Sequence, residues 1–563
     1  MAATGAGEHW PDWPNLPAMM FALAARWPER PMLRAHRAGA WRSWRWGEFA
    51  AQAAAFARTL RARGVAAGDR VLIVSENRPE FFIAETALMA LGAVPVPTYV
   101  TNTPADHAFL LADCGARAAI VSTPALAVRL PRGLDLLIQM DAPLLPGAES
   151  FAALAAPSGA VDEIAAAARA LPAETLACLI YTSGTGGSPK GVMLPHRALL
   201  ANCRGAFALM RPLALGPGDV YLSFLPLSHS FEHLVGQFFL PALGTEIVFG
   251  RGAEHLASDL RDIRPTIMTM VPRLLELVRA RILQQVARGP GWKRALFRAA
   301  LAIGRKRLDG ARLTPFERLA DPLLEALVRR KVRARFGGRL RAAISGGARL
   351  EPEIGRFFLA LGLTLMQGYG QTEAGPVIAA NPPDAIRIAS VGRPLEGVAV
   401  RIAPDGEIEV RGDLVMLGYW NRPEATAAAI RDGWLATGDI GTLSADGYLT
   451  ITDRKKDIIV LSGGENVSPA RLEGLLVAEP EIAQAVVAGD GEASLAALIV
   501  PAEGAAAAAV EEALARVNAT LAPPERIRRH RLVPAFTLEN GFLTPTHKIR
   551  RALVLQQLES PPP

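Results

Sequence analysis

The sequence predicts an α/β protein with at least two domains. Its 563 residues exceed the length at which one hydrophobic core usually stops growing. Short apolar, β-branched runs alternate with longer helical patterns through the first two-thirds of the chain. Near the end, a charged Asp-Arg-Lys-Lys-Asp segment at residues 453–457 precedes a compact mixture of strand and helix patterns.

The alternating part begins with a strand at residues 71–74, followed by a helical pattern over residues 81–91. Further apolar runs are expected to form strands with helical segments between them. They are residues 118–121, 179–181, 247–249 and 267–270. Fully apolar strands that helices separate are typical of sheets covered on both faces.

The pattern of hydrophobic residues changes after Val391. Residues 398–402 and 407–410 alternate around the turn Pro404-Asp405-Gly406, which predicts an antiparallel hairpin. The mixed segment beyond residue 457 includes a helical stretch at 506–521. We place a domain boundary at the charged pentapeptide, so that residues 1–455 form one domain and 456–563 a second, smaller one.

Composition favours a globular enzyme in a reducing compartment. Half of the residues are hydrophobic, and glycine and proline are plentiful without a period. No basic and apolar leader is visible at the start, and no uncharged apolar run reaches the roughly 18 residues of a membrane span. Cys114, Cys178 and Cys203 form neither a disulfide framework nor a metal-ligand spacing. We therefore expect a cytoplasmic location.

The net charge of +7 is concentrated in one segment. Residues 281–335 hold fifteen lysines and arginines against four acids, so the rest of the chain is slightly acidic. A chain that is basic throughout suggests nucleic acid, which is not expected here. A single basic block suggests a local surface for one anionic partner.

The strongest local signal is the run Tyr-Thr-Ser-Gly-Thr-Gly-Gly-Ser-Pro-Lys-Gly at residues 181–191, directly after an apolar strand. Backbone N–H groups and small hydroxyls can surround a polyphosphate there, and a lysine adds charge. The candidate phosphate-binding residues are Thr182, Ser183, Gly184, Thr185, Gly186, Gly187, Ser188 and Lys190. The loop is not a Walker A loop, because Pro189 and Gly191 break that pattern. The alternative is an ordinary surface turn.

This run resembles the phosphate loop of the adenylate-forming superfamily, which includes acyl-CoA synthetases, luciferases and the adenylation domains of peptide synthetases. Seven further segments resemble that family in the same order, from about residue 40 almost to the end of the chain. They are residues 225–229, 345–348, 368–373, 433–439, 453–457, 462–466 and 544–548. The resemblance implies a large N-terminal domain of α/β subdomains with a β-barrel-like subdomain, and a small mobile α+β C-terminal domain.

The same segments supply candidate ligands for a nucleotide and its metal. Tyr369 offers a flat face for adenine, and the slim backbone of Gly346, Gly347 and Ala348 can pass close to the base edge. Glu373, with Thr185, suits Mg²⁺, and Thr372 is expected to bond the α-phosphate. Asp439 can accept from the ribose hydroxyls and Arg454 can donate to them. An ordinary core tyrosine is the alternative for Tyr369.

The resemblance implies further roles. His229 lines the acyl site near the carboxylate, with a purely structural histidine as the alternative, while His233 only shapes the mouth of the pocket. Lys548 neutralises charge gathering between the carboxylate and the α-phosphate. Lys456 is the hinge about which the C-terminal domain rotates. The glycine-containing loop with Gly463, Gly464 and Glu465 then helps to admit the thiol arm of coenzyme A.

The implied activity is ligation of a fatty acid to coenzyme A through an acyl-adenylate, with ATP and Mg²⁺ and with release of pyrophosphate and AMP. Residues 433–456 and the basic insertion at about 281–335 resemble long-chain enzymes. Two alternatives stay open at this point. One is a fatty acyl-AMP ligase that loads an acyl carrier protein, and the other is a non-catalytic anion-binding scaffold.

The basic insertion contains an amphipathic helical pattern. Its apolar side comprises Leu296, Phe297, Ala300, Leu301, Ile303 and Leu308, opposite Arg294, Arg298, Arg305 and Lys306. Such a helix can lie on the anionic inner face of the cell membrane, where a long-chain acid is dissolved. The alternative is a helix packed on its own domain. A homodimer is compatible with these expectations.

Overall fold

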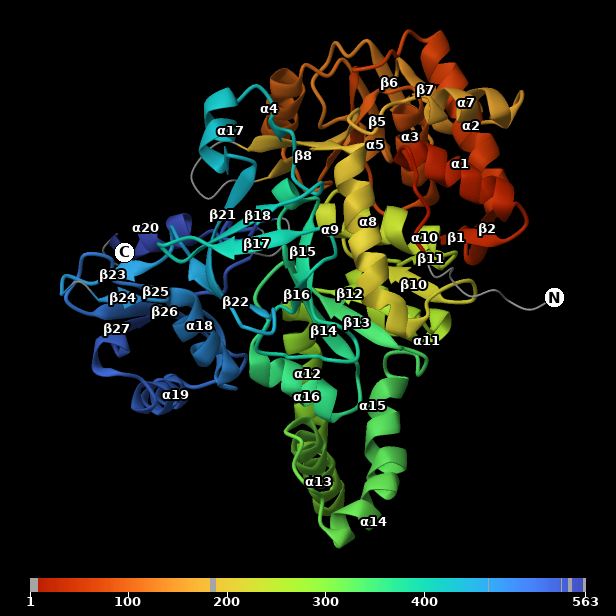
Figure 1. Cartoon of the computed structure of the whole chain (residues 1–563). Coiled ribbons are helices and arrows are strands. Elements are labelled where there is room, and N and C mark those ends of the chain that lie inside the picture. The colour runs from red at the N-terminus through yellow and green to blue at the C-terminus, as the bar shows by residue number, and fades with distance from the viewer. Residues whose placement is uncertain (1–8, 183–188, 464, 538, 545–548, 560–563) are drawn as a thin grey trace.

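The computed structural model describes residues 9–182, 189–463, 465–537, 539–544 and 549–559. Figure 1 shows a large body of sheets and helices, a smaller lobe formed by the C-terminal residues at its side, and a helical protrusion below the body. The architecture is the mixed α/β class that the sequence predicts, with a large N-terminal part and a small α+β C-terminal part.

A nine-stranded sheet runs through the body in the order β16-β15-β14-β13-β12-β10-β11-β1-β2. Its six central strands, from β14 to β1, are parallel, and antiparallel strands complete both edges. The strands are β1 (Pro31–Arg37), β2 (Ala40–Arg45), β10 (Val220–Ser223), β11 (Glu246–Phe249), β12 (Ile267–Met270), β13 (Ala342–Ser345), β14 (Leu365–Gly370), β15 (Val377–Ala380) and β16 (Arg393–Pro394). The predicted strands at 247–249 and 267–270 are confirmed.

A second, parallel sheet has the order β4-β3-β5-β6-β7. Its strands are β3 (Arg70–Val74), β4 (Val94–Thr98), β5 (Ala118–Val121), β6 (Leu136–Gln139) and β7 (Ala148–Ser150). Helix α3 (Pro79–Ala90) contacts both β1 and β4, and all its residues except Glu80 are buried. A helix that is apolar all round needs cover on every side, and this one lies between the two sheets. Helices α1 (Leu16–Arg26), α2 (Trp46–Ala62) and α7 (Val161–Arg169) pack beside it.

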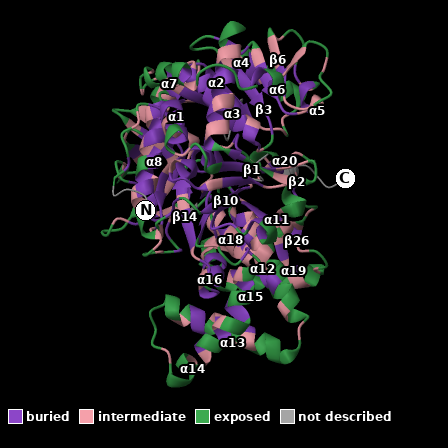
Figure 2. Ribbon diagram, turned by 90° about the vertical axis from the view of Figure 1, so that its right-hand side faces the viewer, coloured by how far each residue is buried: buried purple, intermediate pink, exposed green. Residues whose placement is uncertain are grey.

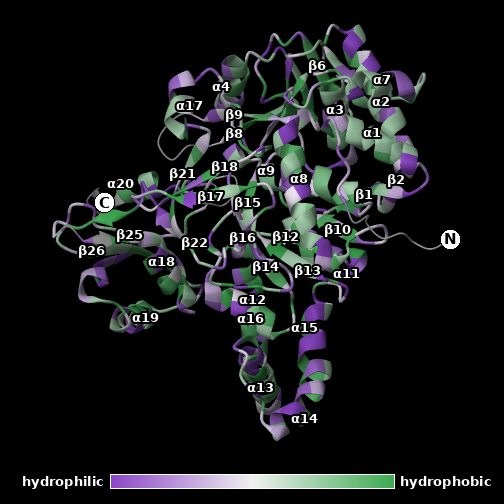
Figure 3. Ribbon diagram, in the orientation of Figure 1, coloured by the Kyte–Doolittle hydropathy of each residue, from purple (hydrophilic) through white to green (hydrophobic). Residues whose placement is uncertain are grey.

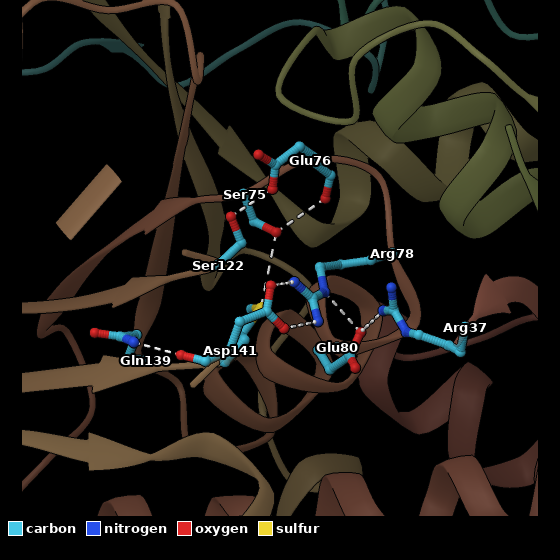
Figure 4. A network of polar contacts seen from close by, with 9 residues as sticks. Arg37, Ser75, Glu76, Arg78, Glu80, Ser122, Gln139 and Asp141 are labelled. Atoms are coloured by element: carbon cyan, nitrogen blue, oxygen red, sulfur yellow. Dashed lines mark hydrogen bonds and ion pairs between the residues drawn. The ribbon is translucent and has the colours of Figure 1, made fainter. Parts of the chain in front are cut away.

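A polar network ties the start of α3 to both sheets (Figure 4). The nearly buried Arg78 guanidinium donates to both carboxylate oxygens of Asp141, which follows β6, at 2.8 and 2.9 Å. It also donates to Glu80 at 2.8 Å, and Arg37, at the end of β1, donates to the same carboxylate. The hydrogen bonds from Arg78 hold the pKa of Asp141 below its usual value. The segment between β3 and α3 is therefore held in place beside the site described below.

Residues 179–181 form part of strand β8 (Leu176–Thr182), as expected, but no helix follows this strand directly. Instead β8 turns into β9 (Lys190–Pro195) as an antiparallel hairpin, and β19 (Gly418–Tyr419) extends it to three strands. The long helix α8 (His196–Met210) begins only after β9. The expected helical segment between the strands at 179–181 and 247–249 is present as α8, but the strand β9 before it was not predicted.

The predicted hairpin after Val391 is confirmed as β17 (Ala399–Ile402) and β18 (Glu407–Arg411). These strands form an antiparallel sheet with β20 (Ile430–Arg431), β21 (Trp434–Leu443) and β22 (Leu449–Arg454). The C-terminal part has its own hydrophobic clusters. Its elements are β23 (Ile459–Val460), β24 (Asn466–Val467), α18 (Pro469–Ala478), β25 (Ile482–Ala488), β26 (Leu495–Pro501), α19 (Ala507–Ala519), β27 (Ile527–Leu532) and α20 (Arg551–Glu559).

The basic insertion is helical. It comprises the end of α12 (Pro272–Ala287), then α13 (Gly291–Leu308), α14 (Pro315–Leu324), the π-helical turn η4 (Glu325–Arg329) and α15 (Arg330–Ala334). Figures 1 and 2 show that α13 and α14 lie below the sheets, with α14 at the far end. Figure 3 shows that hydrophilic and hydrophobic residues alternate along this protrusion.

The apolar side of α13 is covered by the protein itself. Phe297, Ala300 and Ile303 are buried, and the Phe297 ring centroid lies 6.2 Å from that of Phe357 on α16 (Pro352–Ala360). A Cβ at Gly304 would lie 2.1 Å from the Ala360 carbonyl oxygen, so glycine is required at this crossing. Of the helix's predicted membrane-facing cations, Arg305 pairs with Glu353 and Lys306 with Glu317. The geometry supports the packed-helix alternative for α13, and of its predicted apolar side only Leu308 is classed as exposed.

Candidate functional site

The β8–β9 hairpin carries the glycine-rich loop. Thr182 pairs with Lys190 across the hairpin, and these two residues flank the loop. A Cβ at Gly191 would lie 3.0 Å from Leu179 Cδ1 and 3.1 Å from the Tyr181 ring, so a larger residue on the returning strand would require these side chains to shift. Ser183, Gly184, Thr185, Gly186, Gly187 and Ser188 lie outside the described residues, so their roles stay predictions.

The segment that ends in His229 is fixed from two directions. The Asn77 side chain donates to the Leu225 carbonyl at 2.6 Å and accepts from the Leu227 backbone N–H at 2.9 Å. His229 caps the short helix α9 (Ser230–Leu234), where its Nδ1 accepts from the Phe231 N–H at 3.3 Å. The imidazole therefore has a structural task at this site, whatever else it contacts.

Helix α9 also contacts the segment that carries Thr372. The hydroxyls of Ser230 and Thr372 are hydrogen-bonded at 2.9 Å. Gly346, the first residue after β13, lies against Phe231, because a Cβ at this glycine would come within 3.0 Å of the Phe231 ring. Gly347 has a φ of +81°, a conformation that glycine adopts without strain, and both Gly347 and Ala348 are exposed. The 345–348 and 368–373 segments thus meet at α9.

Tyr369, Asp439 and Arg454 form a hydrogen-bonded chain. The buried Tyr369 hydroxyl donates to Asp439 Oδ2 at 2.7 Å, and Arg454 Nε lies 2.9 Å from Asp439 Oδ1. Asp439 on β21 and Arg454 on β22 are direct cross-strand partners. Burial and the charge of Asp439 raise the pKa of Tyr369 well above its ordinary value, so the phenol stays a donor. Three residues that the sequence singled out separately therefore form one unit.

Glu373 has a partner that the sequence analysis missed. The Tyr419 hydroxyl donates to Glu373 Oε1 at 3.0 Å, and Lys190 Nζ lies 4.8 Å from the centre of the Tyr419 ring. The Met416 N–H also donates to the Glu373 carbonyl at 3.0 Å. Burial and the nearby Glu373 charge raise the pKa of Tyr419 above its usual value. Its only signal in the sequence is a lone Gly-Tyr-Trp run, 46 residues beyond Glu373.

Under α9 lies a closed polar cluster that the sequence analysis also missed. Glu232 accepts from the hydroxyls of Tyr221, Ser223 and Thr269 at 2.5 to 2.9 Å. Burial raises its pKa to about 7. His233 is fully buried as well, with its Nε2 3.2 Å from Glu85 Oε1. His233 does not lie at the mouth of a pocket, so that expectation was wrong: it belongs to the interior.

The C-terminal candidates are only partly described. Lys456 is exposed in the turn between β22 and β23, while its neighbour Lys455 is anchored to Asp405 and Glu407 at 2.6 and 2.7 Å. Gly463 and Glu465 are exposed in the loop between β23 and β24. Gly464 and Lys548 lie outside the described residues. On α18, Gly474 lies against Glu351, since an added Cβ would be 2.7 Å from a Glu351 carboxylate oxygen.

Several of the described candidates lie at the ends of β13 and β14, where Gly346 and Thr372 contact α9. A carboxylate, a hydroxyl, a lysine and a donor–acceptor chain converge there, which suits a nucleotide with its phosphates. Among the described residues, no group of three or more His, Cys, Asp or Glu side chains is arranged to hold a metal ion.

Comparison with known families decides the matter. The model of the AMP-binding enzyme family matches residues 20–420, and that of the AMP-binding enzyme C-terminal domain matches residues 456–560. The chain belongs to the AMP-binding enzyme family. This AMP-binding enzyme is 35% identical to the long-chain-fatty-acid–CoA ligase FadD15 of Mycobacterium tuberculosis, over 98% of its own length and 96% of the relative. It is 31% identical to the long-chain-fatty-acid–CoA ligase 1 of Cavia porcellus, over 85% and 76% of the two chains.

Solved structures share the fold of this AMP-binding enzyme. The anthranilate CoA ligase AuaEII in complex with anthranoyl-AMP superposes with a TM-score of 0.76 at 22% identity, over 98% of both chains. A benzoate CoA ligase from Burkholderia xenovorans LB400 gives 0.74 at 24% identity, over 96% of this chain and 99% of that one. In the part of the chain that the structure covers, no helix is both long and apolar enough to cross a bilayer.

Proposed function

We propose that the protein ligates a long-chain fatty acid to coenzyme A through an acyl-adenylate. The observation that carries this proposal is its full-length similarity to long-chain-fatty-acid–CoA ligases, at 35% identity over 98% of the chain. The contact of Thr372 with Ser230 on α9, together with the Tyr369–Asp439–Arg454 chain on β14, β21 and β22, supports a nucleotide site there.

In the first half-reaction a fatty-acid carboxylate oxygen attacks the α-phosphorus of ATP. The new P–O bond gives the acyl-adenylate, and the bond to the β-phosphate oxygen breaks to release pyrophosphate. Thr372, held by Ser230, is proposed to bond the α-phosphate. Asp439 and Arg454 hold the ribose, Gly346–Ala348 pass the base edge, and the glycine-rich loop with Lys190 receives the β- and γ-phosphates. Lys548 supplies the positive charge that this step needs.

ATP enters such reactions with Mg²⁺, and the residues present fit that ion. Glu373 is a hard oxygen ligand whose Oε1 is oriented by Tyr419, while its Oε2 has no partner among the described residues. Thr185 is the proposed second protein oxygen. The metal, when bound with ATP, neutralises phosphate charge. Glu373 and Tyr419 serve to position it.

In the second half-reaction the thiol sulfur of coenzyme A attacks the acyl carbonyl carbon and AMP leaves. We propose that residues 456–563 form a mobile domain that rotates about Lys456 between the two steps. Support comes from the separate hydrophobic clusters of this part and from the anchored Lys455 beside the exposed Lys456. The rotation is proposed to bring Gly463, Gly464 and Glu465 towards the thiol arm.

Two alternatives are not favoured. Enzymes that load a carrier protein typically carry an insertion before the C-terminal domain, whereas here only four residues separate β22 from β23. A non-catalytic scaffold would not need the Tyr369–Asp439–Arg454 chain or the oriented Glu373. Peripheral association with an anionic membrane and a homodimer remain parts of the proposal, and sedimentation of the purified chain tests the dimer.

Pyrophosphate release, measured with short-, medium- and long-chain fatty acids with and without coenzyme A, tests the function. We expect the highest kcat/KM with long chains, AMP and pyrophosphate in equal amounts, and an acyl-CoA product only with coenzyme A. Acyl transfer to a carrier protein but not to coenzyme A would overturn the proposal. So would the absence of pyrophosphate release with any acid.

A further inference from the structure

An apolar stripe runs along one side of α14 and η4. Phe316, Leu319, Leu323 and Leu327 are 79%, 78%, 55% and 39% exposed. Their spacing of three or four residues places them on one helical face. A neighbouring face carries Leu324 and Val328, which are buried in the hydrophobic cluster beneath the nine-stranded sheet. The helix therefore uses one apolar face for its own packing and presents a second one to solvent.

This stripe, defined by Phe316, Leu319, Leu323 and Leu327, begins at the outermost point of the molecule. In Figures 1 and 2, α14 forms the end of the helical protrusion, away from the sheets and from the C-terminal lobe. A flat surface can therefore reach it without meeting the body. Contiguous apolar surface at such a point is uncommon unless it meets a partner.

The charges around the stripe are strongly one-sided. All four acids of the insertion form ion pairs: Asp309 with Arg356, Glu317 with Lys306, Asp321 with Arg307 and Arg329, and Glu325 with Arg333. Many cations of the insertion have no acidic partner among the described residues. They are Arg281, Arg288, Lys293, Arg294, Arg298, Arg312, Arg318, Arg330, Lys331 and Arg335. The positive charge is therefore left uncompensated beside exposed leucine and phenylalanine.

We propose that this stripe inserts into the headgroup region of a bilayer that contains anionic lipids, while Arg312 and Arg318 pair with lipid phosphates. Apolar side chains flanked by cations match the two layers of such a membrane surface. A second copy of the chain is disfavoured because its insertion carries the same surplus of positive charge. Nucleic acid is disfavoured as well, because binding its phosphate backbone does not require an exposed row of leucines.

This proposal rests on the proposed function in one respect: a long-chain fatty acid, the proposed substrate, is dissolved in the membrane. It differs from the expectation for α13, whose apolar face is buried. The contact surface is the next helix, α14, and its cations are those that the protein has not already paired. The protrusion would hold the body near the bilayer.

The test is co-sedimentation of the full chain with phosphatidylcholine vesicles, with and without phosphatidylglycerol, at low salt. The stripe variant combines Phe316→Ser and Leu319→Ser. The charge variant combines Arg312→Gln and Arg318→Gln. Matched controls are Val128→Ser with Leu144→Ser, which are also exposed, and Arg132→Gln with Arg431→Gln, which are exposed and lack ion pairs among the described residues. Ligation of octanoate, a soluble acid, is measured in parallel.

We expect binding only to vesicles with phosphatidylglycerol, weakened about tenfold or more in the stripe and charge variants and unchanged in both controls. Octanoate ligation should stay unchanged throughout. Vesicle binding that depends on Arg312 and Arg318 but not on Phe316 and Leu319 would overturn the proposal, as would a stripe variant that only turns a dimer into a monomer. The absence of pyrophosphate release by the wild type with any fatty acid would instead refute the proposed function and leave the vesicle result standing.

Discussion

Tyr419 and Glu373 are joined by a 3.0 Å hydrogen bond across two separate parts of the fold. Tyr419 lies on β19, which pairs with β9 and so belongs to the hairpin of the glycine-rich loop. Glu373 lies in the short turn after β14. The phenol therefore links the hairpin of the glycine-rich loop to the proposed metal carboxylate, and the Lys190 ammonium lies over its ring.

Tyr419→Phe should weaken the apparent affinity of the enzyme for Mg²⁺ without unfolding it. A hydrogen bond to a charged group contributes about 1.5–3 kcal/mol, so the Mg²⁺ concentration for half-maximal ATP–pyrophosphate exchange should rise about tenfold or more. The rate at saturating Mg²⁺ should change much less. Tyr448→Phe is the matched control, because its hydroxyl donates to the Ala385 carbonyl at 2.7 Å, away from the site. Identical Mg²⁺ curves for both variants would contradict the positioning role of Tyr419.

Lys548→Ala should separate the two half-reactions. If this lysine stabilises charge during adenylation, ATP–pyrophosphate exchange should fall by roughly two to three orders of magnitude, the effect of one lost preorganised donor. Thioester formation from supplied acyl-adenylate should suffer far less. Lys331→Ala, at an exposed cation of the insertion, serves as the control. Equal losses in both half-reactions would remove Lys548 from its assigned role.

Much of the architecture was accessible from the sequence, because strands that are apolar on both faces and a Pro-Asp-Gly turn are local signals. Strands β3, β5, β11 and β12 and the β17–β18 hairpin were found in this way. The β8–β9 hairpin was not predicted, because a seven-residue polar loop between two apolar strands is compatible with several topologies. Its partner β19 pairs with β9 from more than 200 residues away, which no local pattern reports.

In the candidate site, too, local sequence signals were predictable and contacts between distant residues were not. Asp439 and Tyr369 were predicted separately as nucleotide ligands, but their mutual hydrogen bond joins residues 70 positions apart in the sequence. The amphipathic pattern of α13 was real, yet periodicity shows only that a face is apolar and not what covers it. Here the covering surface is Phe357 and its neighbours on α16. The exposed stripe on α14 lies within a helix that the pattern did not single out.

Lys456→Pro should block the proposed domain rotation. The Lys456 backbone N–H donates no hydrogen bond within the described residues, so proline removes none and acts mainly by fixing φ. We expect adenylate formation to persist and thioester formation to collapse. Lys456→Ala keeps the backbone free and should retain both half-reactions. Normal overall turnover in the proline variant would show that the hinge lies elsewhere.

The buried Glu85–His233 pair makes stability depend on pH in two directions. Burial raises the pKa of Glu85 to about 8 and lowers the pKa of His233 to about 4. Gln237 donates to Glu85 Oε2 at 2.7 Å, and a proton on Oε1 would bridge the 3.2 Å to His233 Nε2. The neutral acid and the neutral imidazole are thus the forms that the interior accommodates.

Glu85→Gln should therefore abolish one limb of the pH–stability profile. A carboxyl whose folded pKa is raised binds its proton more tightly in the folded state, so its stabilising effect is complete below about pH 4.5 and is lost as the pH rises towards about 8. Glutamine mimics the protonated acid and cannot titrate. Wild-type Tm should fall as the pH rises from about 5 to about 8, whereas the Tm of the variant should stay nearly level.

His233, with a lowered pKa, loses its stabilising contribution as the pH falls from about 6.5 to about 4, and that acid limb of the profile should persist in the variant. Glu80→Gln is the matched control: the pKa of Glu80 is lowered because its pairing with Arg78 outweighs the cost of burial, so this variant should leave the alkaline limb intact. Parallel Tm profiles for the wild type and Glu85→Gln would show that Glu85 is already ionised in the folded protein.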